Sequence, residues 1–261
     1  MNRRSVHAAA LLLAVCCACA RTRADAAEAA AGAPRPAAAS PQSADTVWQV
    51  SPFAVLLRGG FDGVVTTGQL LQHGSLGVGA ADALDGEIAV MDGNVYQFMP
   101  GGVVVRPGPS LPIPFAIVTP WAGGESIRLP RGLEFTAPLL PSIDSRLPTT
   151  DAFYALRLTG TWSTVRARTF KKQSRPYGPI TPEAEDRYTL TDVTGTMVGF
   201  REPSYVDSLS VPSWHLHFVT GDGRRGGHVL GFTANEVVLS WSPRPYFTVY
   251  VPPRVPAIPP P

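Results

Sequence analysis

Cysteine is scarce in this sequence: its three cysteines, Cys16, Cys17 and Cys19, all lie near the N-terminus. The residues that follow offer no thiolate, unless Cys19 is retained as a lipidated first residue. This excludes a cysteine nucleophile, a thiolate zinc site, an iron–sulfur cluster and an internal disulfide from the rest of the chain. The chemistry of the protein must therefore come from other side chains.

Charged side chains and long apolar runs are also scarce. Charged residues make up 16% of the 261 residues, and the formal net charge is +2. Residues 1–26 hold four of the arginines and one aspartate, so the rest of the chain carries 18 basic and 19 acidic side chains, a formal charge of −1. This balance gives no support for nucleic-acid binding. No stretch beyond residue 26 approaches about 18 apolar residues, so we expect no membrane contact after processing unless the chain is lipidated.

The N-terminus has the features of a secretory signal peptide. Arg3 and Arg4 form a positively charged start, and the apolar run Ala8–Ala20 has 13 residues, too few for a stable membrane anchor. Small residues then provide two cleavage motifs, so we predict a signal peptide over residues 1–26 and an exported protein, periplasmic or secreted. A lipoprotein and an uncleaved anchor are the alternatives. Residues 27–44 are rich in Ala, Pro and Ser and are expected to form a disordered linker.

Glycine and proline, in contrast, are abundant, with 25 and 27 residues. This composition disfavours long helices and favours short strands joined by turns. Hairpins are predicted at Glu87–Phe98, around Asp92-Gly93, and at Phe153–Thr169, around Thr159-Gly160, and a further strand is predicted at Phe115–Thr119. The few helical patterns are Thr67–His73, with a Thr cap, and a poorer candidate at Leu133–Ile143.

These patterns indicate an α+β fold with two mixed or antiparallel β-sheet domains and few helices. We expect an N-terminal domain over residues 45–145 and a C-terminal domain over residues 146–250, divided by the Pro-rich segment near 138–150. The C-terminal domain would carry the metal site described below. A Pro-rich tail over residues 251–261 ends the sequence.

Three of the five histidines, His215, His217 and His228, fall within 14 residues. The segment Ser213–Thr220 alternates polar and apolar residues as a strand does, so His215 and His217 would share one face. A two-residue turn at Asp222-Gly223 would place His228 directly opposite His217, on the same face. Opposed Cβ atoms lie about 4.5–5.5 Å apart, which is close enough for the imidazoles to share one ion.

Three imidazoles on one sheet face suit a divalent transition metal. Zinc is the default, with Fe, Mn, Ni or Co as alternatives. Three protein ligands leave coordination positions open for substrate or water, which is typical of a catalytic site. A histidine-rich surface hairpin without metal is the alternative interpretation. A cupin is disfavoured, because Gly221 stands where a cupin usually carries a glutamate.

Several further segments are informative when they are taken together. They are Phe61–Gly74, Leu84–Gln97, Pro114–Thr119, Tyr154–Arg157, Val165–Thr169, Pro176-Tyr177, Gly195–Phe200, His215–Phe218 and Gly226–Val229. On these segments the sequence resembles the α-acetolactate decarboxylase family from about Gly60 to Phe232.

The resemblance implies a two-domain α+β fold, a homodimer and a small hydroxy-keto acid as substrate. The implied reaction is decarboxylation of 2-acetolactate to acetoin, in which the metal is the electron sink for an enediolate and no organic cofactor is needed. The three histidines would be the metal ligands. Glu87 would lie at the metal and is a candidate proton donor, and Arg168 would hold the substrate carboxylate.

The sequence also departs from the family pattern. Ala80 stands where a threonine is typical, and no Asp or Glu follows Glu236, whereas the family places a glutamate in its C-terminal tail. An exported metal-binding protein of the same fold that has lost or changed the decarboxylase activity is therefore the main alternative. A metal-dependent decarboxylase or aldolase-type enzyme for another hydroxy-keto acid is the third hypothesis.

Overall fold

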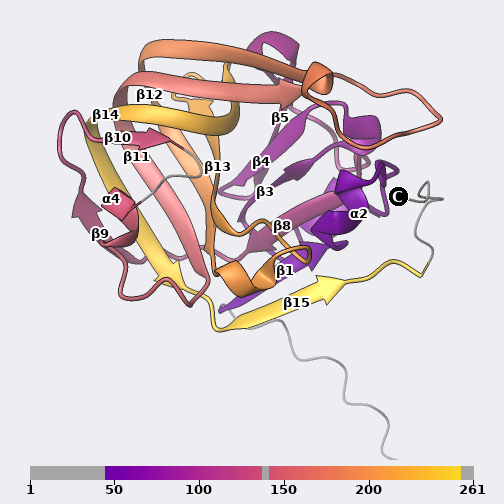
Figure 1. Ribbon diagram of the computed structural model, residues 1–261, viewed down its shortest axis with the longest axis horizontal. Helices are drawn as coiled ribbons and strands as arrows, with labels where there is room; N and C mark the ends of the chain where they lie inside the picture. Colours follow the sequence, from indigo (N-terminus) through magenta and orange to yellow (C-terminus); the bar gives the residue numbers. More distant parts are fainter. Residues whose placement is uncertain (1–44, 137–140, 254–261) are drawn as a thin grey trace, which may run out of the picture. The chain divides into compact units, whose positions relative to one another are not determined.

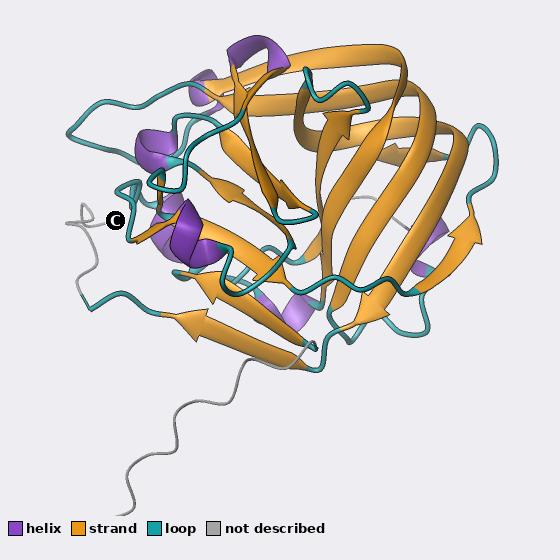
Figure 2. Cartoon of the chain, turned by 180° about the vertical axis from the view of Figure 1, so that it is seen from behind, coloured by secondary structure: helices purple, strands orange, loops and turns teal. Residues whose placement is uncertain are grey.

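The computed structural model describes residues 45–136 and 141–253. This part of the chain consists mainly of β-strands with a few short helices, which confirms the predicted α+β class (Figure 1, Figure 2). The predicted signal peptide at 1–26 and linker at 27–44 lie outside the described residues, as does most of the predicted tail. Within the described ranges, no helix has the length and apolar character needed to cross a membrane.

The first sheet has seven strands and is mixed. Its order is β15 (Tyr246–Tyr250), β1 (Thr46–Val50), β8 (Phe115–Thr119), β3 (Leu76–Ala80), β4 (Glu87–Met91), β5 (Asn94–Met99) and β6 (Val103–Val105). β1 and β15 are parallel, whereas the other neighbours are antiparallel. The predicted hairpin at Glu87–Phe98 is confirmed, and Asp92 and Gly93 have the positive φ values, 52° and 73°, that its tight turn requires. The strand predicted at Phe115–Thr119 is confirmed as β8.

The second sheet has six strands and curves back on itself. Its members are β9 (Glu125–Arg128), β10 (Glu134–Thr136), β11 (Tyr154–Phe170), β12 (Glu185–Glu202), β13 (Ser213–Thr220) and β14 (Gly226–Pro243). The four long strands form a closed ring of hydrogen-bonded neighbours, because β14 pairs with β11 along most of its length and with β13 at its beginning. Figure 1 shows the strong curvature of these strands. At the closing point, His228 of β14 pairs with both His217 of β13 and Arg168 of β11.

Buried apolar side chains form three clusters around the sheets. One cluster combines side chains of both sheets, such as Phe98 from the first and Phe200 from the second, so the two sheets pack against each other there. Another is built from side chains of the second sheet and includes Trp162 and Phe218, whose rings are 5.2 Å apart. A third includes Ile88 and covers the other face of the first sheet. The functional residues described below lie where the two sheets meet.

The remaining elements are short. They are α2 (Phe53–Leu57), α3 (Thr67–Leu70), α4 (Pro141–Asp144), β2 (Val65–Thr66), β7 (Pro112–Ile113) and the 3-10 turns η1 (Asp82–Leu84), η2 (Pro100–Gly102), η3 (Pro182–Ala184) and η4 (Ser204–Val206). A helix is present in the predicted segment Thr67–His73, but it ends earlier than predicted. Its cap is Thr66: the Thr66 hydroxyl accepts a hydrogen bond from the Gln69 N–H, and the Gln69 side chain accepts one from the Thr66 N–H.

The hairpin predicted over Phe153–Thr169 is wrong, because these residues belong to the single strand β11. Gly160 does not turn the chain; it pairs with Gly195 on one side and with Val237 on the other. A Cβ on Gly160 would lie 1.9 Å from the carbonyl oxygen of Glu236. This glycine therefore permits a close approach of two strands, which local sequence patterns do not distinguish from a turn.

The helix predicted over Leu133–Ile143 is also wrong. The segment contains β10 and the beginning of α4, and residues 137–140 between them lie outside the described residues. Phe135 of β10 is buried and stacks on Phe232 of β14 with ring centroids 4.7 Å apart. Packing against β14 therefore accounts for the strand at Glu134–Thr136.

The predicted domain boundary near residue 145 stays a prediction. The two sheets exchange strands across it, since β9 and β10 precede it and pair with β14, whereas β15 follows it and pairs with β1. The long strands β11 to β14 all lie within residues 146–250, and they carry the three clustered histidines.

Candidate active site

The clustered histidines lie on β13 and β14, at the point where the second sheet closes. His217 is paired with His228 in the register that the sequence predicted. His215 lies two residues before His217 and shares its face of β13. Trp214 and Phe218 point to the opposite face and pack in the core of the second sheet. Burial of these aromatic side chains therefore fixes the direction of the imidazoles.

The three imidazole rings form a compact triangle. Each pair of ring centroids is 5.1 Å apart, and one nitrogen of each ring lies within 4.8 Å of the others. Burial lowers the pKa of His215, His217 and His228 well below the ordinary histidine range, and the nearby Arg168 lowers those of His215 and His228 further. The rings are therefore neutral near pH 7, which is the state that binds a metal ion.

A backbone contact orients His217. Its Nδ1 lies 2.7 Å from the carbonyl oxygen of Ile88 on β4, so Nδ1 carries the proton and donates it to that carbonyl. Its Nε2 is left with a lone pair and lies 3.2 Å from Nδ1 of His228. Nδ1 of His215 is buried and has no hydrogen-bond partner among the described residues. Ring nitrogens that converge in this way suit a shared cation.

Glu87 reaches this triangle from the first sheet. It is the first residue of β4 and is 5% exposed. Its Oε1 lies 3.4 Å from Nδ1 of His228 and 3.8 Å from Nε2 of His217. Its Oε2 is buried without a hydrogen-bond partner in the described part of the chain. Gly86 has a φ of 83°, and a Cβ there would lie 2.1 Å from the carbonyl oxygen of Phe98, so a glycine is required where the chain enters β4.

Arg168 completes the polar cluster from β11. Its Nη1 lies 3.5 Å from Oε2 of Glu87, and its Nε lies 3.6 Å from Oε1 of Glu185. Nη1 is buried and has no hydrogen-bond partner among the residues that the structure describes, so the guanidinium retains a donor for a ligand. Arg166, two residues earlier, donates instead to the hydroxyl of Thr136 on β10.

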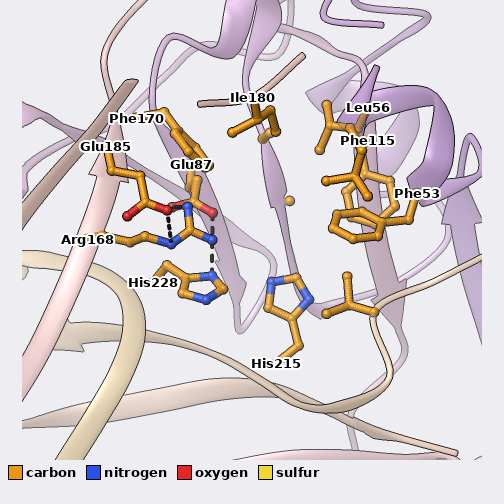
Figure 3. A pocket seen from close by; sticks show the side chains of 14 residues that line it. Phe53, Leu56, Glu87, Phe115, Arg168, Phe170, Ile180, Glu185, His215 and His228 are labelled. Atoms are coloured by element: carbon orange, nitrogen blue, oxygen red, sulfur yellow. Dashed lines mark ion pairs between the residues drawn. The ribbon is translucent and has the colours of Figure 1, made fainter. Parts of the chain in front are cut away.

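With the exception of the fully buried His217, these polar groups line one side of a cavity of about 280 Å³. Figure 3 shows Glu87, Arg168, Glu185 and His228 gathered on that side with His215 next to them, and Phe53, Leu56 and Phe115 across from them, while Ile180 lies near Phe170 and Glu87. Phe53 and Leu56 come from α2, and Phe115 begins β8. The cavity therefore offers charges and ring nitrogens opposite a hydrocarbon wall, which suits a small anionic molecule that carries alkyl groups.

The structure brings together all the side chains that the sequence singled out, namely Glu87, Arg168, His215, His217 and His228. The sequence analysis missed Glu185 and the hydrocarbon wall from α2. Glu185 belongs to no motif, and its place follows from the pairing of β12 with β11, where it lies opposite Phe170. Ala80, which departs from the family pattern, also lines the cavity.

Known proteins resemble this chain in both sequence and structure. A family model described as alpha-acetolactate decarboxylase matches residues 47–255. The alpha-acetolactate decarboxylase of Methanosarcina mazei is 37% identical over 193 residues, which cover 73% of this chain and 67% of that protein. The alpha-acetolactate decarboxylase of Brevibacillus brevis is 34% identical over 217 residues, which cover 82% of this chain and 76% of that protein. The crystal structure of alpha-acetolactate decarboxylase from Bacillus subtilis strain 168 matches with a TM-score of 0.75 and 28% identity, over 80% of this chain and 90% of that one. This chain therefore belongs to the alpha-acetolactate decarboxylase family.

Proposed function

We propose that this protein decarboxylates 2-acetolactate to acetoin with the help of a divalent metal ion. The observation that carries the proposal is that His215, His228, Glu87 and Arg168 line a single cavity, while His217 completes the imidazole triangle from behind His228 and Glu87. Membership of the family supports the substrate, since the relatives found by sequence are named alpha-acetolactate decarboxylases. A volume of about 280 Å³ is sufficient for a molecule of this size.

The side chains fit the ion that the resemblance implies. Three imidazole nitrogens lie within 4.8 Å of one another. Nδ1 of His215 is buried without a hydrogen-bond partner among the described residues, and Oε1 of Glu87 lies 3.4 Å from Nδ1 of His228, so both atoms are placed to serve as ligands. His215, His217 and His228 would hold the ion, with Glu87 beside it. A set rich in imidazole suits zinc, with Fe, Mn, Ni or Co as alternatives.

A bound divalent ion would act as a Lewis acid that polarises the ketone and stabilises the negative charge developing on its oxygen. The substrate would be oriented by the protein's own side chains. Arg168 has an unused Nη1 donor in the cavity, which supports its role as the partner of the substrate carboxylate. Leu56 and Phe115, on the apolar side, would contact the methyl groups and keep water away from the reacting carbon (Figure 3).

The reaction requires one bond to break and one proton to be added. The bond between the carboxylate carbon and the carbinol carbon breaks, the electron pair moves towards the ketone oxygen, and CO₂ leaves. A proton then adds to the carbinol carbon and gives acetoin. Glu87 is suited to take a proton from solvent and deliver it to that carbon, because its carboxyl group lines the cavity.

Incubation of metal-loaded protein with racemic 2-acetolactate tests this function. We expect acetoin to accumulate well above the rate without protein. Protein that holds about one ion per chain but forms no acetoin would contradict the proposal and favour a metal-binding protein of the same fold. The observation that favours this second function is the small side chain of Ala80 in the cavity wall.

We further propose that the protein is exported and acts as a homodimer. The positively charged start and the apolar run within residues 1–26 support export. Mass spectrometry of the native protein is expected to find its first residue between Ala20 and Asp45, and retention of residues 1–20 would contradict export. Sedimentation of the purified protein is expected to give the mass of two chains.

A further inference from the structure

Glu185 is a charged side chain of the cavity to which the reaction above assigns no task. It is the first residue of β12, and its side chain is 16% exposed. Its Oε1 lies 3.6 Å from Nε of Arg168, and its Oε2 lies 2.5 Å from Nε of Arg187. One carboxylate thus connects two guanidinium groups, of which one faces the cavity and the other is largely exposed.

The register of β11 with β12 explains this arrangement. Arg168 is directly opposite Arg187, and Phe170 is directly opposite Glu185. Residues that are opposite on antiparallel strands, or two apart on one strand, share a face of the sheet, so all four side chains lie together. Like charges that face each other directly repel. Glu185, diagonal to Arg168, supplies the negative charge that lets the two arginines lie side by side.

Two carboxylates lie beside the guanidinium of Arg168, and each is near a different nitrogen. Oε2 of Glu87 lies 3.5 Å from Nη1, and Oε1 of Glu185 lies 3.6 Å from Nε (Figure 3). The guanidinium carbon is 4.3 Å from the centre of the Phe170 ring, which supports it from the same strand. The two nearly equal distances mean that Arg168 is shared between the two carboxylates and is not in a close pair with either one.

We propose that Glu185 is a positioning residue that keeps Arg168 from closing onto Glu87. Glu185 attracts the Nε edge of the guanidinium, which prevents Arg168 from moving closer to Glu87. The guanidinium therefore stays available for a substrate carboxylate, and Glu87 stays available for proton transfer. Loss of the negative charge at residue 185 would let Arg168 and Glu87 form a tight ion pair, in which each neutralises the other. This inference rests on the proposed function of the cavity, and Glu185 acts through Arg168 without touching the reacting atoms.

Glu185→Gln tests the proposal with little change in side-chain size. We expect kcat/KM for 2-acetolactate to fall by roughly 10- to 10²-fold, as when a group that contacts the substrate is misplaced by about 1 Å. The metal content should stay that of the parent. Glu185→Asp retains the carboxylate and is expected to recover part of the loss. Glu183→Gln is the matched control, because Glu183 is exposed and lies two residues earlier, on η3. Equal activity of Glu185→Gln and the parent would overturn the proposal.

A second readout does not depend on activity. The Nε–Hε NMR signal of Arg168, identified by its loss in Arg168→Lys, reports the contacts of that group directly. We expect the signal to shift in Glu185→Gln and to keep its position in Glu183→Gln. A signal that is unchanged in Glu185→Gln would overturn the positioning role. If the parent forms no acetoin but the signal shifts, the contact between Glu185 and Arg168 stands and the proposed function is the part that fails.

Discussion

Three buried polar atoms of the cavity lack a hydrogen-bond partner among the described residues: Nδ1 of His215, Oε2 of Glu87 and Nη1 of Arg168. Oε2 and Nη1 lie 3.5 Å apart as an ion pair, so each has an opposite charge beside it without a hydrogen bond. Nδ1 of His215 has neither, and a buried polar atom that is left unpaired costs roughly 1–3 kcal/mol of stability. These open donor and acceptor positions are explained if the cavity is built to receive a cation and an anionic molecule.

The substitution Arg168→Lys separates metal binding from chemistry. A guanidinium cannot ligate a cation, so we expect the fold and the metal content to be unchanged. The lysine keeps the positive charge but loses the planar, bidentate fork that matches a carboxylate. Decarboxylation is expected to fall by roughly 10²-fold or more, as on removal of one oxyanion donor. Acetoin formation at several substrate concentrations measures this.

Arg166→Lys is the control for that experiment, because Arg166 lies on the same strand and its side chain contacts Thr136. We expect it to change the rate little. An Arg168→Lys protein that turns over 2-acetolactate as fast as the parent would show that the arginine is wrongly assigned.

Glu202, at the end of β12, gives a prediction for the pH dependence of stability. Its side chain is fully buried, and burial raises the pKa of its carboxyl from 4.5 to about 8. Between these two pKa values the folded protein keeps a proton that the unfolded chain has released. The free energy of unfolding should therefore fall as the pH rises from about 4.5 to 8, by about 1.4 kcal/mol per pH unit from this group.

The variant Glu202→Gln cannot titrate at this position, so we expect it to lack this contribution. Urea unfolding at several pH values between 5 and 8.5 measures the free energy of unfolding of both proteins. As the pH rises, we expect this free energy to fall more in the parent than in the variant. Glu183→Gln, at an exposed position, should follow the parent. Parallel curves for Glu202→Gln and the parent would contradict a protonated carboxyl at residue 202.

At the scale of elements, the closure of the second sheet creates the site. The beginning of β14 lies between β13 and β11, so His228 is paired with His217 on one side and with Arg168 on the other. A single strand thus aligns two proposed metal ligands and the proposed carboxylate partner. The length of β11, 17 residues, makes this possible, because the same strand runs from the core at Tyr154 to the cavity at Arg168.

Gly160 is the position where the continuity of β11 can be tested. A Cβ at this residue would lie 1.9 Å from the carbonyl oxygen of Glu236 on the neighbouring strand, so Gly160→Ala must force the strands apart. We expect a loss of roughly 1–3 kcal/mol, as is typical of overpacking, measured as a lower urea midpoint. At Gly108, a Cβ would meet nothing within 4 Å, so Gly108→Ala should leave the midpoint nearly unchanged. An equal midpoint for Gly160→Ala and the parent would be inconsistent with the close approach.

The sequence predicted those features that depend on neighbours along the chain. The Asp92-Gly93 turn specifies the β4–β5 hairpin, and a short turn between β13 and β14 is sufficient to pair His217 with His228. Features that depend on distant strands could not be predicted in this way. Gly160 resembles a turn until β14 is placed beside it. The proximity of Glu87 to the histidines was suggested by the family resemblance alone, because it arises from packing between two sheets.

At the scale of the whole molecule, the cavity exists only when the two sheets are packed together. Glu87 is contributed by β4 of the first sheet, whereas the histidines and Arg168 come from the second. The apolar cluster that joins the sheets, with Phe98 and Phe200 among its members, therefore also maintains the site. An ion held by ligands that converge only in the folded state binds the native form preferentially, so the site should also contribute to stability when it is loaded.

The central claim is that the three histidines hold one divalent ion and that the loaded cavity decarboxylates 2-acetolactate. Titration of metal-stripped protein with zinc, and in parallel with the alternative ions, while acetoin formation is followed, tests both parts at once. We expect the rate to rise in proportion to the added ion and to level off at about one ion per chain. The same titration of His217→Ala should give little rise, because one ligand is lost. A rate that does not depend on the added ion, or a parent that binds one ion per chain and forms no acetoin, would contradict the account.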